Sequence, residues 1–145
     1  MKKPNLLQFI TPKADVAFIY EDMTIRQTLE KMDYYKYSVI PVIDDEGIYK
    51  GTISEGDLLR FIKNDVNFDI QEAEGVKINK APRYRPYKAL SINVSFDEVF
   101  SLSMAQNFVP LTDDRGVFIG IIKRATLLNF LKDFLEENKE CLISD

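Results

Sequence analysis

The sequence predicts an α/β (α+β) fold made of two β-α-β-β-α units packed with pseudo-two-fold symmetry. Three observations support this prediction. A segment of the first half recurs in the second half with matched prolines, turns and glycines. In each copy, short β-branched runs alternate with segments whose apolar residues recur at helical spacing. An acidic turn that ends in glycine joins two of these runs, which is typical of a β-hairpin.

The internal repeat is the strongest signal in the sequence. Residues 39–62, VIPVIDDEGIYKGTISEGDLLRFI, align with residues 108–131, FVPLTDDRGVFIGIIKRATLLNFL, at a constant offset of 69. The alignment matches the proline, the Asp-Asp-x-Gly turn, the following glycine and the double leucine. Residues 23–32 match residues 94–103 at an offset of 71, so the second copy is two residues shorter before its proline. The repeat indicates two copies of one supersecondary unit.

The elements of the first copy follow in order along the chain. The segment DVAFIY, residues 15–20, predicts a short strand, and Thr24 is a good N-cap for the helix after it. YSVIPVI, residues 37–43, is a β-branched strand. In the turn DDEG, aspartate starts the turn and Gly47 supplies a positive φ. IYKGTIS then returns as the second hairpin strand, and the last helix begins near Asp57.

The repeat boundaries divide the chain into four parts. We expect the first repeat at residues 13–66 and the second at residues 87–135. A connector at residues 67–86 begins acidic and ends basic and rich in proline, and residues 136–145 form a polar C-terminal tail.

The last helix of each copy has an apolar arc wider than the roughly 100° that one core requires. In the first copy the arc contains Leu58, Leu59, Phe61 and Ile62. The second copy repeats and extends it with Leu127, Leu128, Phe130, Leu131, Phe134 and Leu135. Such a helix is either well buried in one small domain or has a second apolar neighbour in another subunit. The second interpretation predicts a homodimer packed through these helices.

Composition narrows the possible functions. Apolar residues make up 46% of the 145 residues and charged residues 29%, which is typical of a globular protein. The net charge of −4 argues against nucleic acid or an anionic membrane as the partner. No apolar run approaches the roughly 18 residues that a membrane-spanning helix requires. The N-terminus lacks a signal-peptide core and Cys141 is the single cysteine, so we expect a cytoplasmic protein.

The absence of histidine disfavours catalysis and metal binding. The sequence lacks the commonest general base and metal ligand, and one cysteine without histidine cannot form a nucleophile pair. The remaining carboxylate candidates for an enzyme lie at residues 44–46 and 113–114. Both groups fall in predicted hairpin turns, where water keeps carboxylates near their ordinary pKa and makes them poor general acids. We therefore expect no catalytic residues and no metal.

The repeat resembles a tandem pair of cystathionine-β-synthase (CBS) domains, the Bateman module. TIRQTLEKM, YSVIPVIDDEG and GTISEGDLL carry the resemblance in the first copy. NFVPLTDDRGVFIGII and TLLNFL carry it in the second. The match extends over nearly the whole chain. The chain therefore resembles a stand-alone bacterial CBS pair without an attached enzyme or transporter.

The resemblance implies an adenosine site in the first copy. CBS repeats that bind adenosine ligands use the pattern G-h-x-(S/T)-x-x-D, where h is apolar, and residues 51–57 fit it except that Thr52 is only weakly apolar. Asp57 would accept hydrogen bonds from the two ribose hydroxyls, and Ser54 would bind phosphate or ribose. Adenine would lie between apolar strand residues, Val39, Ile40 and Pro41, and backbone groups of Phe18, Ile19 and Tyr20 would read its edge. The alternative interpretation is that Ser54 or Asp57 caps a helix.

The second copy departs from the family pattern. Lys123 replaces the hydroxyl residue and Thr126 replaces the carboxylate, so a standard mononucleotide site is not expected there. Lys123 and Arg124 would instead offer positive charge to a phosphate of a nucleotide held by the first copy. Arg83 and Arg85, in APRYRPY, are further phosphate candidates. The alternative is that these cations are solvated surface charges.

The resemblance favours a regulatory module over two other classes. An adenine nucleotide (AMP, ADP, ATP or cyclic di-AMP) would bind between the repeats, shift the subunits and change binding to a partner protein. S-Adenosylmethionine is a further option. The second class is a structural homodimer with a vestigial site, and the third is an enzyme that uses the turn carboxylates.

Overall fold

The computed structural model describes residues 4–65 and 70–139, and it confirms the predicted α+β fold. The order β-α-β-β-α occurs twice. The first repeat contains β2 (Ile19–Tyr20), α1 (Ile25–Tyr35), β3 (Val39–Ile43), β4 (Tyr49–Ser54) and α2 (Glu55–Asp65). The second repeat contains β5 (Leu90–Ser91), α4 (Phe96–Ser103), β6 (Phe108–Thr112), β7 (Phe118–Lys123) and α5 (Arg124–Glu137).

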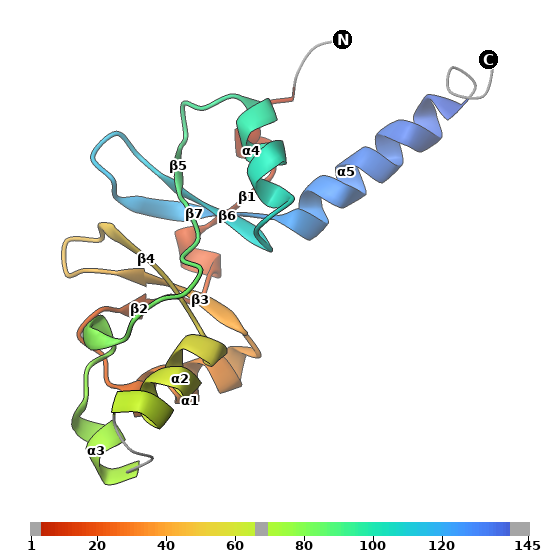
Figure 1. Ribbon diagram of the computed structural model, residues 1–145. Coiled ribbons are helices and arrows are strands. Elements are labelled where there is room, and N and C mark those ends of the chain that lie inside the picture. Colours follow the sequence, from red (N-terminus) through yellow and green to blue (C-terminus); the bar gives the residue numbers. More distant parts are fainter. Residues whose placement is uncertain (1–3, 66–69, 140–145) are drawn as a thin grey trace.

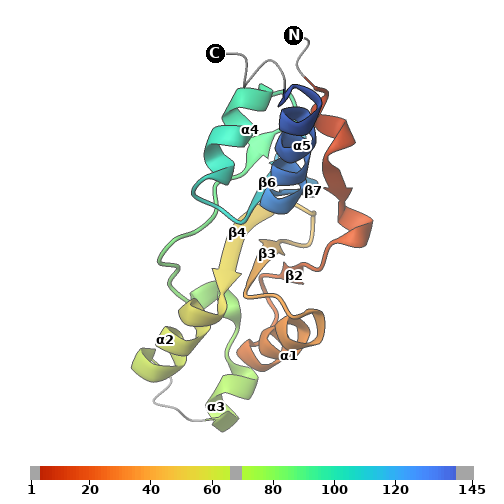
Figure 2. The same cartoon turned by 90° about the vertical axis from the view of Figure 1, so that its right-hand side faces the viewer.

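Each repeat builds its own sheet, and the two sheets face one another in the middle of the molecule (Figure 1). In the first sheet the strand order is β2-β3-β4, with β2 parallel to β3 and β3 antiparallel to β4. The second sheet has the order β1-β7-β6-β5. Helices α1, α2 and α3 lie at one end of the molecule and α4 and α5 at the other, with the strands between them (Figure 2).

The fourth strand of the second sheet was not predicted from the sequence. It is β1 (Ile10–Pro12), which comes from the N-terminal segment and pairs antiparallel with β7. A short 3₁₀ helix, η1 (Leu6–Gln8), precedes it. Leu6 and Phe9 are buried in the core of the second repeat, where the Phe9 ring lies 5.1 Å from that of Phe130. Burial of these two side chains fixes the segment on the distant sheet.

The two hairpins contact one another around the pseudo-two-fold axis. The Tyr49 N–H donates to the Gly116 carbonyl at 3.0 Å, and the Phe118 N–H donates to the Gly47 carbonyl at 2.9 Å. Each member of one pair corresponds to a member of the other at the repeat offset of 69. Between the sheets, a shared core of buried side chains joins the repeats: Val16, Ile43, Phe108, Phe118 and Ile121.

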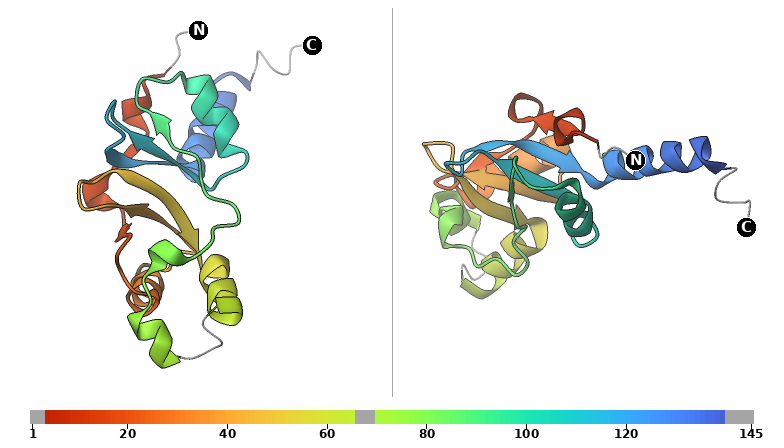
Figure 3. Two further views of the ribbon diagram at one scale, coloured as in Figure 1. Left: turned by 60° about the vertical axis from the view of Figure 1, so that its left-hand side comes forward. Right: turned by 90° about the horizontal axis from the view of Figure 1, so that it is seen from above.

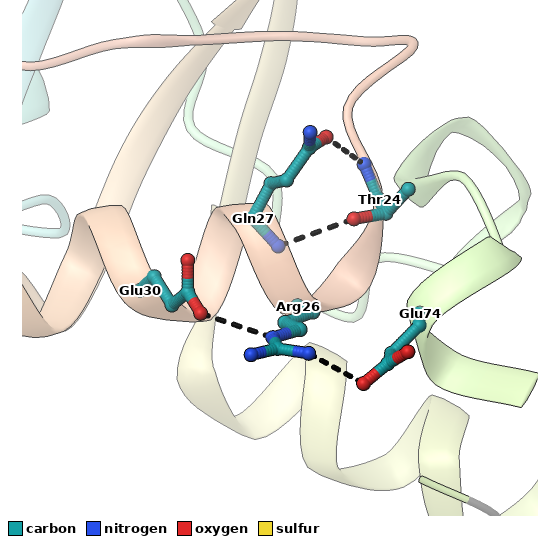
Figure 4. Close-up of polar contacts among 5 residues, drawn as sticks. All are labelled: Thr24, Arg26, Gln27, Glu30 and Glu74. Atoms are coloured by element: carbon teal, nitrogen blue, oxygen red, sulfur yellow. Dashed lines mark hydrogen bonds and ion pairs between the residues drawn. The ribbon is translucent and has the colours of Figure 1, made fainter. Parts of the chain in front are cut away.

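Matching capping boxes start the first helix of both repeats. The Gln27 N–H donates to the Thr24 hydroxyl at 3.2 Å, and the Thr24 N–H donates to the Gln27 side chain at 3.0 Å (Figure 4). Ser95 and Glu98 form the same reciprocal pair at the start of α4. The predicted N-cap at Thr24 is therefore confirmed, and each box satisfies two N–H groups that a helix start leaves unpaired.

The described part of the connector packs on the first repeat. Helix α3 (Ile70–Gly75) lies beside α1, where Arg26 pairs with Glu74 of α3 and with Glu30 of its own helix (Figure 4). The 3₁₀ helix η3 (Ile78–Lys80) follows, and Ile78 is fully buried in the core of the first repeat. From η3 the chain runs along the side of both halves toward β5 (Figure 3).

The last helices bury one leucine of each pair and expose the other. Leu58 and Leu127 are in the cores of their own repeats, whereas Leu59 is 61% exposed and Leu128 is 54% exposed. Helix α5 extends away from the rest of the molecule (Figures 1 and 3). A substitution at Leu58 or Leu127 would therefore test the core rather than a subunit contact. Cys141 lies outside the described residues.

Candidate functional site

A pocket of about 860 Å³ lies between the two repeats, beside the strand-to-helix junction of the first. Its walls come from three places: β3, β4 and α2 of the first repeat, the chain leading into the second repeat, and the loop before β6. The lining residues are Val39, Thr52, Ser54, Gly56, Asp57, Arg60, Tyr84, Arg85, Pro86, Tyr87, Ala105 and Gln106.

Ser54 and Asp57 form a reciprocal pair at the start of α2. The Asp57 N–H donates to the Ser54 Oγ at 3.0 Å, and the Ser54 N–H donates to the Asp57 Oδ2 at 3.0 Å. This is the geometry of a capping box in which aspartate takes the place of glutamate. Their three-residue spacing therefore starts the helix, and both side chains also line the pocket.

The carboxylate of Asp57 holds a third backbone group. Its Oδ1 accepts the Tyr84 N–H at 3.2 Å, and Arg60 Nη1 lies 3.9 Å from the same oxygen. Asp57 is only 4% exposed, and it lines the 860 Å³ pocket. An ionised carboxylate has about four lone-pair positions. Two of them accept the backbone N–H groups of Ser54 and Tyr84, and the others remain for ligand hydroxyls.

Two arginines place positive charge at the pocket. Arg60 lies one helical turn after Asp57, and its guanidinium stacks over the Tyr84 ring with Cζ 4.4 Å from the centroid. Arg85 lines the pocket from the chain that leads into the second repeat. Guanidinium groups bind phosphate through paired N–H donors. Sequence reasoning missed Arg60, although its position three residues after Asp57 on the predicted helix was a usable signal.

Arg83 has a structural position. It donates to the Lys50 carbonyl and lies against Gly51, where an added Cβ would be 2.7 Å from Arg83 Nη1. Gly51 has a φ of +103°, which favours glycine. Burial lowers the pKa of Arg83, while Tyr49, Asp57 and Glu21 act in the opposite direction. Arg83 does not line the 860 Å³ pocket, in contrast to Arg85.

The residues expected around adenine are not all brought together. Val39 lines the pocket, whereas Ile40 and Ile19 are fully buried in the first core and Pro41 is also buried. Tyr20 is 40% exposed in β2. The ring of Phe18 lies between the sheets, with the ammonium groups of Lys13 and Lys31 at 5.1 Å and 5.2 Å from its centroid.

A second pocket, of about 310 Å³, is the counterpart of the first under the repeat symmetry. Val39, Thr52, Ser54 and Gly56 of the larger pocket correspond to four lining residues of the smaller one: Phe108, Ile121, Lys123 and Ala125. Its other lining residues are Lys36, Tyr37, Ser38, Val39 and Asn107. A lysine and apolar side chains thus replace the hydroxyls of Ser54 and Thr52.

The three phosphate candidates of the second repeat have different surroundings. Lys123 is exposed and lines the smaller pocket. Arg124 donates from Nε to the Ser103 carbonyl at 2.7 Å, which ties the start of α5 to the end of α4. Thr126 is half-buried in the first turn of α5. None of the three lines the larger pocket.

The acidic turns carry local hydrogen bonds. Asp44 Oδ1 accepts the N–H groups of Glu46 and Ile48, each at 2.9 Å. Asp113 Oδ1 accepts those of Arg115 and Val117 at 2.8 Å and 2.9 Å. These bonds, that of Val117 first, hold the pKa of Asp113 below its ordinary value. Such contacts are those expected of turn residues.

Residues 4–65 and 70–139 contain neither a cluster of metal ligands nor a helix suited to a membrane. Within these ranges, histidine, cysteine and acidic side chains form no group of three or more that could hold a metal ion. Among the helices of the same ranges, none combines the length and the apolar character that crossing a bilayer requires.

Comparison with known proteins gives one family model and one curated relative that match parts of the chain. The model of the CBS domain matches residues 8–64. An uncharacterized protein of Rickettsia prowazekii (strain Madrid E) is 28% identical over 117 residues, which cover 79% of this chain and 34% of the relative. The chain thus spans about a third of the length of the curated relative that it matches.

Solved structures with 20–22% identity share the fold over most of the chain. CbpB in complex with c-di-AMP has a TM-score of 0.84 at 20% identity and covers 94% of this chain and 90% of its own. CbpB of Listeria monocytogenes, also in complex with c-di-AMP, has a TM-score of 0.80 at 20% identity, with coverages of 92% and 98%. CBSX2 in complex with AMP has a TM-score of 0.68 at 22% identity, with coverages of 88% and 95%.

The repeat architecture, the two pseudo-symmetric pockets and these matches agree with one another. Residues 8–64 carry the CBS sequence signature, and the described chain as a whole has the fold of CBS-pair proteins. The chain is thus similar to the CBS-domain proteins in the sequence of residues 8–64 and in the fold of its described residues.

Proposed function

We propose that this chain is a regulatory module that binds an adenine nucleotide in the 860 Å³ pocket and thereby changes the binding of a partner protein. One observation carries the proposal. A buried carboxylate with unused acceptor positions, Asp57, shares that pocket with Arg60 and Arg85, so one cavity offers partners for ribose hydroxyls and for phosphates.

The size and chemistry of the pocket support a nucleotide. A volume of about 860 Å³ is within the range of about 300–1,000 Å³ that ligand sites occupy. Candidate ligands are AMP, ADP, ATP and cyclic di-AMP, and S-adenosylmethionine is a further option. CbpB and CBSX2, which share the fold, were solved with c-di-AMP and AMP, respectively. The turn carboxylates are bonded to their own turns, which supports binding rather than catalysis.

Thermal denaturation with added nucleotide tests the proposal. A ligand at about a hundred times its Kd adds roughly 2.7 kcal/mol to the free energy of unfolding. For a chain of this length, that corresponds to a rise of about 5–10 °C in Tm. Guanine nucleotides should give a smaller rise if the pocket reads adenine.

A substitution at Asp57 identifies the site. Asp57→Asn removes the charge but keeps one acceptor oxygen, so the fold is disturbed less than by alanine. We expect it to remove most of the nucleotide-induced rise in Tm, with each variant compared to itself without ligand. Thr126→Ala, at the equivalent position of the second repeat, is the control and should keep the full rise. If AMP, ADP, ATP and cyclic di-AMP all leave Tm unchanged at millimolar concentration, the nucleotide proposal is wrong.

The proposal includes a homodimer packed through the last helices. Leu59 of α2 and Leu128 and Leu135 of α5 are exposed, and solvent-exposed leucines in corresponding positions of both repeats favour a partner helix. Leu59→Glu with Leu128→Glu should give a folded monomer in sedimentation experiments. A monomeric unmodified protein at tens of micromolar would contradict this part. If the dimer forms but no nucleotide binds, the structural-dimer alternative is favoured.

A further inference from the structure

The chain that enters the second repeat is held by side chains instead of by a neighbouring strand. We call residues 84–88 the strap, and residues 84–87 form one wall of the 860 Å³ pocket. The Tyr84 N–H donates to Asp57 at 3.2 Å, and the Tyr87 N–H donates to Thr52 Oγ1 at 2.9 Å. The Lys88 N–H donates to Gln106 Oε1 at 2.7 Å. Each of these backbone groups thus depends on one particular side chain.

A hydrogen bond from the strap accounts for the threonine at position 52, where the family pattern has an apolar residue. The G-h-x-(S/T)-x-x-D pattern has an apolar residue at this position, and the second repeat has Ile121 there. Thr52 is only 1% exposed, and its hydroxyl accepts the Tyr87 N–H. An apolar side chain of the same size would leave that part-buried N–H without its acceptor, which is unfavourable. The hydroxyl is therefore matched to the strap.

Tyr49 binds the carbonyl group of Tyr87, the strap residue whose N–H is bound by Thr52. Its hydroxyl donates to the Tyr87 carbonyl at 2.8 Å. Burial raises the pKa of Tyr49 well above its ordinary value, so the phenol stays protonated and remains a donor. Both polar groups of the Tyr87 backbone are thus bound by side chains of the strand β4.

Gln106 ties the strap to the second repeat. It is 6% exposed, and its amide nitrogen donates to the carbonyls of Lys88 at 3.1 Å and of Phe108 at 3.2 Å. Together with the bond from the Lys88 N–H, these contacts link the strap to β6. The equivalent residue of the first repeat is Tyr37, which has no carboxamide. Thr52 and Gln106 therefore hold the strap from opposite repeats.

We propose that Thr52 and Gln106 are positioning residues of the ligand pocket, which fix the strap so that Tyr84 and Arg85 face Ser54 and Asp57. The expected effect on ligand affinity rests on the proposed function. The hydrogen bonds from Thr52 and Gln106 to the strap, which we call the tethers, do not depend on it. A segment without a strand partner has backbone freedom, and ordering it at the moment of binding would weaken affinity. The two tethers remove that freedom before a ligand arrives.

Thr52→Val tests the tether, because valine keeps the shape of threonine and lacks the hydroxyl. Without ligand, we expect amide hydrogen exchange at Tyr87 to become at least about tenfold faster, since the N–H loses its acceptor. With AMP and with cyclic di-AMP in calorimetry, we expect Kd to rise about tenfold. Thr52→Ser retains the hydroxyl and should restore both values. Ile121→Val, at the equivalent position of the second repeat, should change neither.

Gln106→Leu is a second, independent variant, in which amide hydrogen exchange is measured at Lys88. The tether is refuted if Tyr87 exchange is unchanged in Thr52→Val, whatever the ligand does. The positioning role is refuted if exchange accelerates while Kd for both nucleotides stays at the wild-type value. If the unmodified protein binds neither nucleotide, the proposed function and the effect on affinity fail together. The hydrogen-exchange result then still decides whether the tether exists.

Discussion

The strand-to-helix junctions of the two repeats occupy equivalent places in the fold and differ in chemistry. Residues 51–57 and 120–126 both leave the second hairpin strand and enter the last helix, and α2 and α5 begin at equivalent residues. The first junction has a hydroxyl and a carboxylate beside a pocket of about 860 Å³. The second has Lys123 and Thr126, and its pocket is about 310 Å³. The fold is thus common to both copies, whereas the hydroxyl and the carboxylate of the pattern occur in the first copy.

The comparison also shows how a helix begins without its cap. At α2, Ser54 and Asp57 bond reciprocally. At α5, the N-cap Lys123 makes no side-chain capping bond. Instead, the Arg124 side chain donates from Nε to the Ser103 carbonyl. The bond from the Arg124 N–H to the Asn107 carbonyl is common to both repeats, since the Glu55 N–H donates to the Ser38 carbonyl in the first. Contacts to other parts of the repeat therefore hold the start of α5, and residues 123 and 126 are free of a local role in capping.

The largest expected effect concerns the glycine that opens each junction. An alanine Cβ at Gly120 would lie 2.4 Å from the Thr11 carbonyl oxygen of β1, whereas at Gly51 it would meet only the end of the Arg83 side chain. We expect Gly120→Ala to cost about 3 kcal/mol of unfolding free energy, because backbone must move. Gly51→Ala should cost about 1–2 kcal/mol, from its positive φ. Urea denaturation measures both, and an equal or reversed order would show that β1 does not constrain the second junction.

A transplanted capping box should give an intermediate effect. Lys123→Ser combined with Thr126→Asp places the residues of the first junction at the start of α5. We expect a gain of about 1 kcal/mol in the free energy of unfolding, since two N–H groups of the helix start acquire acceptors. The double variant with alanine at both positions is the control and should show no gain. A transplant that leaves stability unchanged would mean that the bond from Arg124 to the Ser103 carbonyl already stabilises this helix start as much as a cap would.

The smallest expected effect concerns the turn of the second hairpin. The pKa of Asp113 is lowered in the folded state by bonds from backbone N–H groups, first that of Val117. The stabilisation is therefore fully present above the unfolded pKa, near 3.9, and is lost as the pH falls through the lower folded value. Asp113→Asn should make the fall in Tm between about pH 5 and pH 3 less steep. Asp45→Asn, in the first turn, is the control, and an equal change in both variants would contradict the assignment.

Much of the fold was predictable because its signals are local. The offset of 69 identified two copies, and Thr24 and the acidic turns have positions that depend on residues within four of them. The spacing of Ser54 and Asp57 was compatible with a ligand site and with a helix cap. The geometry of the capping box is itself a local property. Periodicity and turn chemistry act over a few residues, so a single sequence displays them.

The sequence by itself determined the repeat, the hairpins, the helix starts and the residues at the family pattern. Tertiary structure alone decided that residues 10–12 complete the second sheet, that Arg60 stacks on Tyr84, and that Arg85 rather than Arg83 lines the pocket. It also decided the tether between Thr52 and Tyr87, which are 35 positions apart. These contacts join segments that are distant in the sequence. No local sequence pattern predicts these contacts, because burial of side chains such as Phe9 and Ile78 brings the segments together.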